Sequence, residues 1–93
     1  MDTKNYRFET RQIHAGLRAD EPTGSRGIAI WPTAAYRFRS CDHAARLFEL
    51  SEAGNIYTRL QNPTTAALEE RIAALYGAVG ALCVSSGMSA CAR

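Results

Sequence analysis

Two short groups of residues in the second half of the chain have the types and spacing needed to bind a phosphate. The first group, Ser85-Ser86-Gly87, separates an apolar run from an expected helix. The first N–H groups of a helix have no partner inside it and lie at its positive end, and a glycine there lets an anion approach the backbone closely. A phosphate bound here would meet the backbone amides of Gly87 and Met88. Serine and glycine are also ordinary capping residues, so the segment alone is more typical of a plain helix start.

The second group is Tyr57-Thr58-Arg59. In an extended segment, side chains two positions apart point to the same side of the chain, so the tyrosine and the arginine would act together. An arginine can hold a phosphate through two parallel N–H bonds, and the phenol of a tyrosine can donate a third hydrogen bond. Taken alone, this tripeptide is more typical of a surface arginine beside a packed tyrosine.

The remaining reactive side chains form no recognisable site. His14 and His43 are isolated and match no spacing of metal ligands, so we expect structural roles for both and no metal site. Lys4 is the only lysine, and it lies in a polar segment apart from both groups of candidate phosphate-binding residues. Chemistry that requires a lysine Schiff base is therefore not expected from this chain alone. The three cysteines have no metal-binding spacing and are odd in number; they are Cys41, Cys83 and Cys91.

The composition excludes several classes of protein. With 93 residues, of which 46% are hydrophobic and 22% charged, the chain is typical of one small globular domain rather than of a disordered tail. The net charge of +2 comes with dispersed arginines, so we expect no nucleic-acid partner. The first ten residues contain no apolar signal core, and no apolar run reaches the roughly 18 residues of a membrane span. These features and the unpaired cysteines favour a cytoplasmic location.

The secondary structure predicted around the candidate phosphate-binding residues changes along the chain. Residues 1–40 have poor periodicity and are predicted to form an extended arm. Its short apolar stretches, residues 28–31 and 34–36, fit either strands or anchors laid on another surface. Beyond the arm, a short helix is predicted over residues 43–50, with Asp42 as its cap.

The strongest helix signal lies over residues 64–76. Asn62 is a good cap, Pro63 suits the first helical position, and Gly77 suits a helix end. The helix is therefore bounded on both sides by residues with a known positional preference.

Apolar side chains are expected to supply the core. Leu68 and Ile72 fall on one face of this longer helix and are predicted to be buried. Residues 81–84 (Ala-Leu-Cys-Val) form an apolar run typical of a strand buried on both faces. Residues 88–92 are typical of the opening of another helix.

The motifs occur in an order that resembles a known family. They resemble the opening of the Cys/Met-metabolism enzymes that depend on pyridoxal 5'-phosphate (PLP), from about Phe8 to the end of the chain. The matching segments are residues 9–10 (Glu-Thr), 13–16 (Ile-His-Ala-Gly), 54–59 (Gly-Asn-Ile-Tyr-Thr-Arg), 62–64 (Asn-Pro-Thr), 68–69 (Leu-Glu) and 85–90 (Ser-Ser-Gly-Met-Ser-Ala). Because several motifs recur in the same order, the resemblance favours phosphate binding for both groups.

The resemblance implies an α/β fold of the fold-type I, aminotransferase-like class. Residues 1–40 would form an N-terminal arm, and residues 41–93 would form the incomplete beginning of the large PLP-binding domain. Enzymes of the family are several times longer, and their Schiff-base lysine would lie beyond Arg93. The chain is therefore expected to be an N-terminal fragment with no catalytic residue of its own and no activity alone.

The resemblance also implies roles for both groups of candidate phosphate-binding residues. Gly87 and Met88 would hold the phosphate of PLP through their backbone amides. Tyr57 and Arg59 would reach the PLP phosphate of a neighbouring subunit, so a homo-oligomer is expected.

Within the family, residues 43–48 leading into residues 54–57 most resemble the O-acetylhomoserine sulfhydrylases. This implies a full enzyme that replaces the acetate of O-acetylhomoserine by sulfide, a γ-replacement that yields homocysteine. Ala29 stands where the family often has proline, and Gln61 where the lyases commonly have glycine. A relative of cystathionine γ-synthase or γ-lyase therefore stays an alternative. A non-catalytic fragment that only associates with full-length subunits is another.

Overall fold

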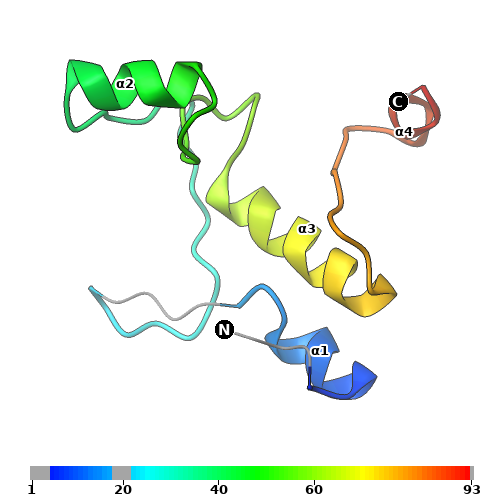
Figure 1. Ribbon diagram of the computed structural model, residues 1–93. Coiled ribbons are helices and arrows are strands. Elements are labelled where there is room, and N and C mark those ends of the chain that lie inside the picture. Colours follow the sequence, from blue (N-terminus) through cyan, green and yellow to red (C-terminus); the bar gives the residue numbers. More distant parts are fainter. Residues whose placement is uncertain (1–4, 18–21, 93) are drawn as a thin grey trace. The chain divides into compact units, whose positions relative to one another are not determined.

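The computed structural model describes residues 5–17 and 22–92, in which short helices are joined by loops (Figure 1). Lys4 lies outside the described residues. The helices are α1 (Phe8–His14), α2 (Cys41–Phe48), α3 (Pro63–Tyr76) and α4 (Gly87–Cys91). Within the described ranges, none of them is both long and apolar enough to cross a membrane. The chain divides into a central unit, Ile30–Pro63, and a terminal unit made of Met1–Ala29 and Thr64–Arg93.

In the terminal unit, α1 lies against α3 with a close backbone approach. Arg71 on α3 donates from Nε to the carbonyl of Ala15 (2.7 Å) and from Nη2 to the carbonyl of Ile13 (2.9 Å). Both carbonyls belong to the C-terminal end of α1, where a helix leaves carbonyl groups without partners. Gly16 has a φ of +76°, and a Cβ there would stand 2.4 Å from the carbonyl oxygen of Ala67. Glycine is therefore required for this approach.

The predicted extended arm is wrong over Phe8–His14, because these residues form α1. Seven residues are too few for a helix to be stable alone, so α1 depends on contacts with α3 rather than on a strong local pattern. Arg11 adds such a contact by donating from Nη1 to the carbonyl of Ala74 (3.3 Å). Residues 28–36 form no strand. The predicted domain division at residue 40 stays a prediction.

The helix predicted over residues 64–76 is confirmed, because α3 begins at Pro63 and ends at Tyr76. Gly77 follows with a φ of +66°. Beyond it, the N–H of Ala78 donates to the carbonyl of Ala73 (2.8 Å), a hydrogen bond that closes the helix end.

The predicted burial of the large apolar residues on α3 is wrong. Leu68 is 52% exposed and Ile72 is 39% exposed, whereas the buried residues of α3 are Ala67 and Ala73. Gly16 brings the end of α1 against the backbone at Ala67, so the contact accepts only small side chains. The larger side chains consequently lie on open faces of the helix.

The predicted strand over residues 81–84 is also absent, and the described part of the chain contains no strand. A strand needs a neighbour with which to form a ladder of hydrogen bonds. Here the N–H of Cys83 donates instead to Oε2 of Glu69 on α3 (2.8 Å), and Leu82 is largely exposed. The last predicted helix is present as α4, which begins at Gly87.

In the central unit, α2 confirms the predicted short helix, but it begins and ends two residues earlier than predicted and has a different cap. Ser40, rather than Asp42, caps it, because the Ser40 hydroxyl accepts a hydrogen bond from the N–H of His43 (3.1 Å). The helix begins directly after Ser40, so Asp42 already lies in its first turn, where a negative charge is favourable. Leu47 is 2% exposed, and a Cβ at Gly54 would stand 2.7 Å from its Cδ2.

Three basic side chains surround Glu52 in the loop after α2. Arg46 Nε lies 2.8 Å from Oε2, Arg39 Nη2 lies 3.2 Å from Oε1, and His43 Nε2 lies 3.9 Å from Oε1. The hydrogen bond from Arg46 lowers the pKa of the Glu52 carboxyl below its usual value, and the nearby positive charges act in the same direction. This network holds the loop against the helix that it follows.

Candidate functional site

The segment that carries Tyr57 and Arg59 is held in place by an earlier part of the central unit. An isolated antiparallel bridge pairs Tyr57 with Ala35. The N–H of Thr58 donates to the carbonyl of Ala34 (2.8 Å), and the Thr58 hydroxyl donates to the carbonyl of Thr33. Thr58 is therefore bound through its backbone and its side chain, so the residues on either side of it have a defined position.

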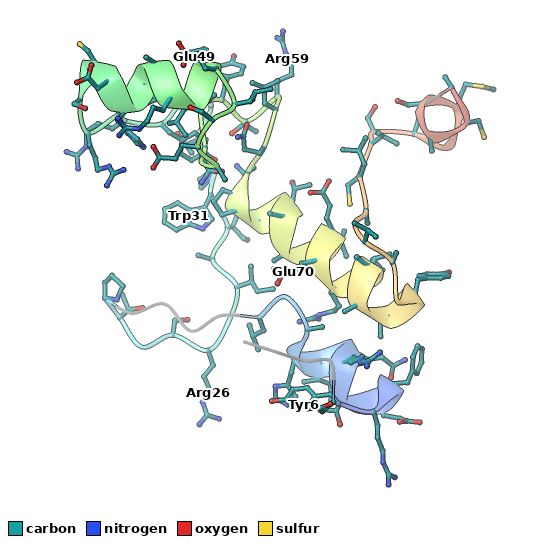
Figure 2. All side chains as sticks on the ribbon, in the orientation of Figure 1. Tyr6, Arg26, Trp31, Glu49, Arg59 and Glu70 are labelled. Atoms are coloured by element: carbon teal, nitrogen blue, oxygen red, sulfur yellow. The ribbon has the colours of Figure 1, made fainter. Side chains whose placement is uncertain are left out.

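Tyr57 and Arg59 lie side by side, although residues 58–60 form a turn rather than the extended segment that the spacing argument assumed. The guanidinium carbon of Arg59 is 5.8 Å from the centroid of the Tyr57 ring, a cation–π distance. Tyr57 is 42% exposed, and the Arg59 side chain extends outward from the ribbon (Figure 2). An open hollow of about 410 Å³ lies beside them, lined by residues 31–34 and 57–59. No carboxylate of the described residues pairs with Arg59, so its N–H donors stay available for an anion.

The Gly87 segment combines both interpretations of its sequence. Ser86 caps α4, because its hydroxyl accepts a hydrogen bond from the N–H of Ser89 (3.1 Å). The N–H groups of Gly87 and Met88, the first two residues of α4, have no partner inside the helix. A Cβ built at Gly87 would meet no atom within 4 Å, so the backbone here is open to an approaching group. The cap therefore leaves two amides accessible.

The two sets of residues predicted to bind phosphate lie in different compact units. Tyr57 and Arg59 belong to the central unit, whereas Gly87 and Met88 belong to the terminal unit. The first pair offers a phenol and a guanidinium, and the second offers backbone amides. Each set of donors is chemically suited to phosphate oxygens.

Each of the two histidines contacts residues of its own compact unit. His14 meets the ring of Tyr6 edge-on, with centroids 6.5 Å apart. His43 Nδ1 accepts a hydrogen bond from the backbone N–H of Arg39 (3.2 Å). Over residues 5–17 and 22–92, no three His, Cys, Asp or Glu side chains gather as a metal site would require.

Sequence reasoning did not assign Asn62 to the site, although it identified this residue as a helix cap and as part of the family motif at residues 62–64. Its side chain is buried, with 6% of the residue exposed. Its Nδ2 donates to the carbonyl of Trp31 (3.0 Å) and to the hydroxyl of Thr58 (3.2 Å). Trp31 is 31 positions away in the sequence, so no local pattern could have indicated the contact.

The sequence is similar to known proteins over a range that includes both candidate phosphate-binding sets. The sequence pattern of the family described as Cys/Met metabolism PLP-dependent enzyme matches residues 9–93. An O-acetyl-L-homoserine sulfhydrylase from Leptospira meyeri is 53% identical over 87 residues, which cover 94% of this chain and 20% of that protein. A homocysteine synthase from Schizosaccharomyces pombe is 49% identical over 90 residues, which cover 97% of this chain and 21% of that protein.

A solved structure agrees with these relatives. The crystal structure of an O-acetylhomoserine (thiol)-lyase from Campylobacter jejuni, which contains N'-pyridoxyl-lysine-5'-monophosphate, matches with a TM-score of 0.88 at 40% sequence identity. The match covers 94% of this chain and 21% of the other chain. The chain thus spans about a fifth of the length of the curated relatives that it matches.

Proposed function

Because the chain belongs to the family of Cys/Met metabolism PLP-dependent enzymes, we propose that it forms the N-terminal part of an O-acetylhomoserine sulfhydrylase. The observation that carries this proposal is the 53% identity to such a sulfhydrylase over 87 residues. The reaction would replace the acetate of O-acetylhomoserine by sulfide and release homocysteine. PLP, when bound, supplies the electron sink that this chemistry at an amino acid requires.

The fold proposed for the whole protein is the α/β fold-type I class. Its support is the TM-score of 0.88 to one stretch of an O-acetylhomoserine (thiol)-lyase. The strand expected at residues 81–84 would form where the rest of the sheet provides neighbours. We also propose a cytoplasmic location, because the cysteines are free and two of them, Cys41 and Cys91, are exposed.

The residues of this chain that would hold the PLP phosphate are the four of the two donor sets. Gly87 and Met88 would bind it through backbone amides that the Ser86 cap leaves accessible. Tyr57 and Arg59 would bind the phosphate of a neighbouring subunit. This sharing of a site between subunits would require a homo-oligomer.

The test compares PLP binding to single variants of the protein that contains this chain. Arg59→Ala should weaken PLP binding roughly ten- to a hundredfold, because a charge-assisted hydrogen bond contributes about 1.5–3 kcal/mol. Arg59→Lys should recover only part of the loss, since lysine keeps the charge without the planar fork. Arg26→Ala, at another exposed arginine, is the matched control and should have no effect. Unchanged PLP dissociation and unchanged homocysteine production in Arg59→Ala would refute the assignment.

A mixing experiment tests whether the site is shared between subunits. Gly87→Val should block PLP binding for a steric reason, because its side chain would occupy the space of the anion. A mixed oligomer of Arg59→Ala and Gly87→Val subunits contains one kind of site that has both an intact Gly87 and an intact Arg59. Activity should therefore reappear on mixing. No recovery, despite subunit exchange shown by mass spectrometry, would contradict the shared site.

A further inference from the structure

Among the described residues, Asn62 is the polar residue that is buried as a whole, with 6% of it exposed. A primary amide removed from water destabilises the fold unless its hydrogen bonds are replaced. Here Nδ2 donates both to the carbonyl of Trp31 (3.0 Å) and to the hydroxyl of Thr58 (3.2 Å). The side chain therefore connects two segments of the central unit directly before the first residue of α3.

Thr58 is the point at which these connections meet. Its hydroxyl accepts from Asn62 and donates to the carbonyl of Thr33, and its N–H donates to the carbonyl of Ala34 (2.8 Å). The Thr58 hydroxyl is thus directed at the protein. The turn that follows is closed by the N–H of Gln61, which donates to the carbonyl of Tyr57 (3.1 Å).

The two residues that flank Thr58 lie beside each other at the surface. Tyr57 and Arg59 are exposed, and the guanidinium carbon of Arg59 is 5.8 Å from the Tyr57 ring centroid. Both side chains line the same open hollow. The hydrogen bonds of Thr58 and the pairing of its exposed neighbours both depend on the backbone conformation of this turn.

We propose that Asn62 is a positioning residue for the phosphate-binding pair Tyr57 and Arg59. Its buried amide holds Thr58, and Thr58 in turn sets the direction of both donors before a phosphate arrives. Without this tether the segment would have to be ordered on binding, and that ordering reduces affinity. The proposal rests on the proposed function, since it takes Tyr57 and Arg59 to bind the PLP phosphate.

The first arm of the test measures the segment without PLP. In the apo form of the protein that contains this chain, amide exchange of Thr58 should be about tenfold faster in Asn62→Ala than in the wild type. Asn5→Ala, which truncates an exposed asparagine, is the matched control and should leave exchange unchanged. Unchanged Thr58 exchange in Asn62→Ala would overturn the proposal.

The second arm measures PLP affinity in two backgrounds. In the wild-type background, Asn62→Ala should raise the dissociation constant of PLP about five- to tenfold. In a Tyr57→Phe/Arg59→Ala background, the same change should have less than about a twofold effect, because the donors it positions are gone. An equal loss in both backgrounds would show a general structural role and overturn the proposal.

A second pair of variants keeps the proposal testable if Asn62→Ala does not fold. Thr58→Val removes the hydroxyl that Asn62 binds, whereas Thr58→Ser retains it. Thr58→Val should weaken PLP binding about five- to tenfold relative to the wild type, whereas Thr58→Ser should retain most of the wild-type affinity. Equal behaviour of the two variants would overturn the proposal.

Failure of the proposed function is a separate result. In that case Arg59→Ala itself leaves PLP affinity unchanged, while the exchange measurement still reports on the hydrogen bond between Asn62 and Thr58.

Discussion

The contact between α1 and α3 makes Gly16→Ala a severe substitution. Any residue other than glycine at a φ of +76° is strained by roughly 1–2 kcal/mol. The added Cβ would also stand 2.4 Å from the Ala67 carbonyl oxygen, about 1 Å closer than an ordinary contact. A shift of about 1 Å would lengthen the 2.7 Å bond between Arg71 Nε and the Ala15 carbonyl beyond hydrogen-bonding distance. Loss of that charge-assisted bond adds about 1.5 kcal/mol, which brings the total near 3 kcal/mol.

Gly77→Ala is the matched control for this substitution. Gly77 also has a positive φ, +66°, but a Cβ there would meet no atom within 4 Å. Its replacement should therefore destabilise the end of α3 by the backbone strain alone, roughly 1–2 kcal/mol. The difference between the two variants, about 1.5 kcal/mol, is the effect of the close approach to Ala67 and corresponds to roughly a tenfold change in an equilibrium constant.

Amide hydrogen exchange measures both effects locally. The N–H of Ala15 is bonded to the carbonyl of Arg11 (3.1 Å) and reports on the end of α1, whereas the N–H of Ala78 reports on the end of α3. Relative to the wild type, exchange at Ala15 in Gly16→Ala should accelerate about tenfold more than exchange at Ala78 in Gly77→Ala. If the two variants accelerate exchange equally, the close approach does not contribute and the reasoning is refuted.

Two further predictions concern charge and chemistry. The pKa of Glu52 is lowered mainly by the hydrogen bond from Arg46, so Arg46→Ala should raise it toward the ordinary glutamate value of about 4.3, as an NMR titration of the carboxyl would show. The charged carboxylate is the form that the fold favours, so its stabilising effect is complete above that ordinary pKa and is lost as the pH falls through the lowered value; an unchanged titration in Arg46→Ala would contradict this cause. The 93-residue chain with PLP, O-acetylhomoserine and sulfide should produce no homocysteine above a blank, because Lys4 is its only lysine. Turnover that survives Lys4→Ala would contradict the second prediction.

Features that depend on adjacent residues were predictable from the sequence. The bounds of α3 follow from a proline at its first turn and a glycine just after its end, and both preferences act within a few residues. The same holds for α4, whose start at Gly87 follows a serine that caps it. At α2 the local signals were ambiguous, because Ser40 and Asp42 are both good caps and only the observed hydrogen bond distinguishes them.

Features that depend on a distant neighbour were not predictable in this way. The helix α1 has seven residues and relies on Arg71, which lies more than 50 positions away. The apolar pattern placed Leu68 and Ile72 on one face of a helix, but the predicted burial of that face is wrong, because burial depends on what covers it. The run at residues 81–84 has the composition of a strand, and a strand forms only where another strand pairs with it.

The candidate site shows the same division between local and tertiary causes. The sequence by itself determined the donor types, a phenol and a guanidinium at Tyr57 and Arg59 and two free amides at Gly87 and Met88, because residue chemistry and helix starts are local properties. Only the tertiary structure decided that Asn62 is buried and holds the segment before it. Its hydrogen bond to Trp31 joins residues 31 positions apart, and such a contact exists only once the chain has folded back on itself.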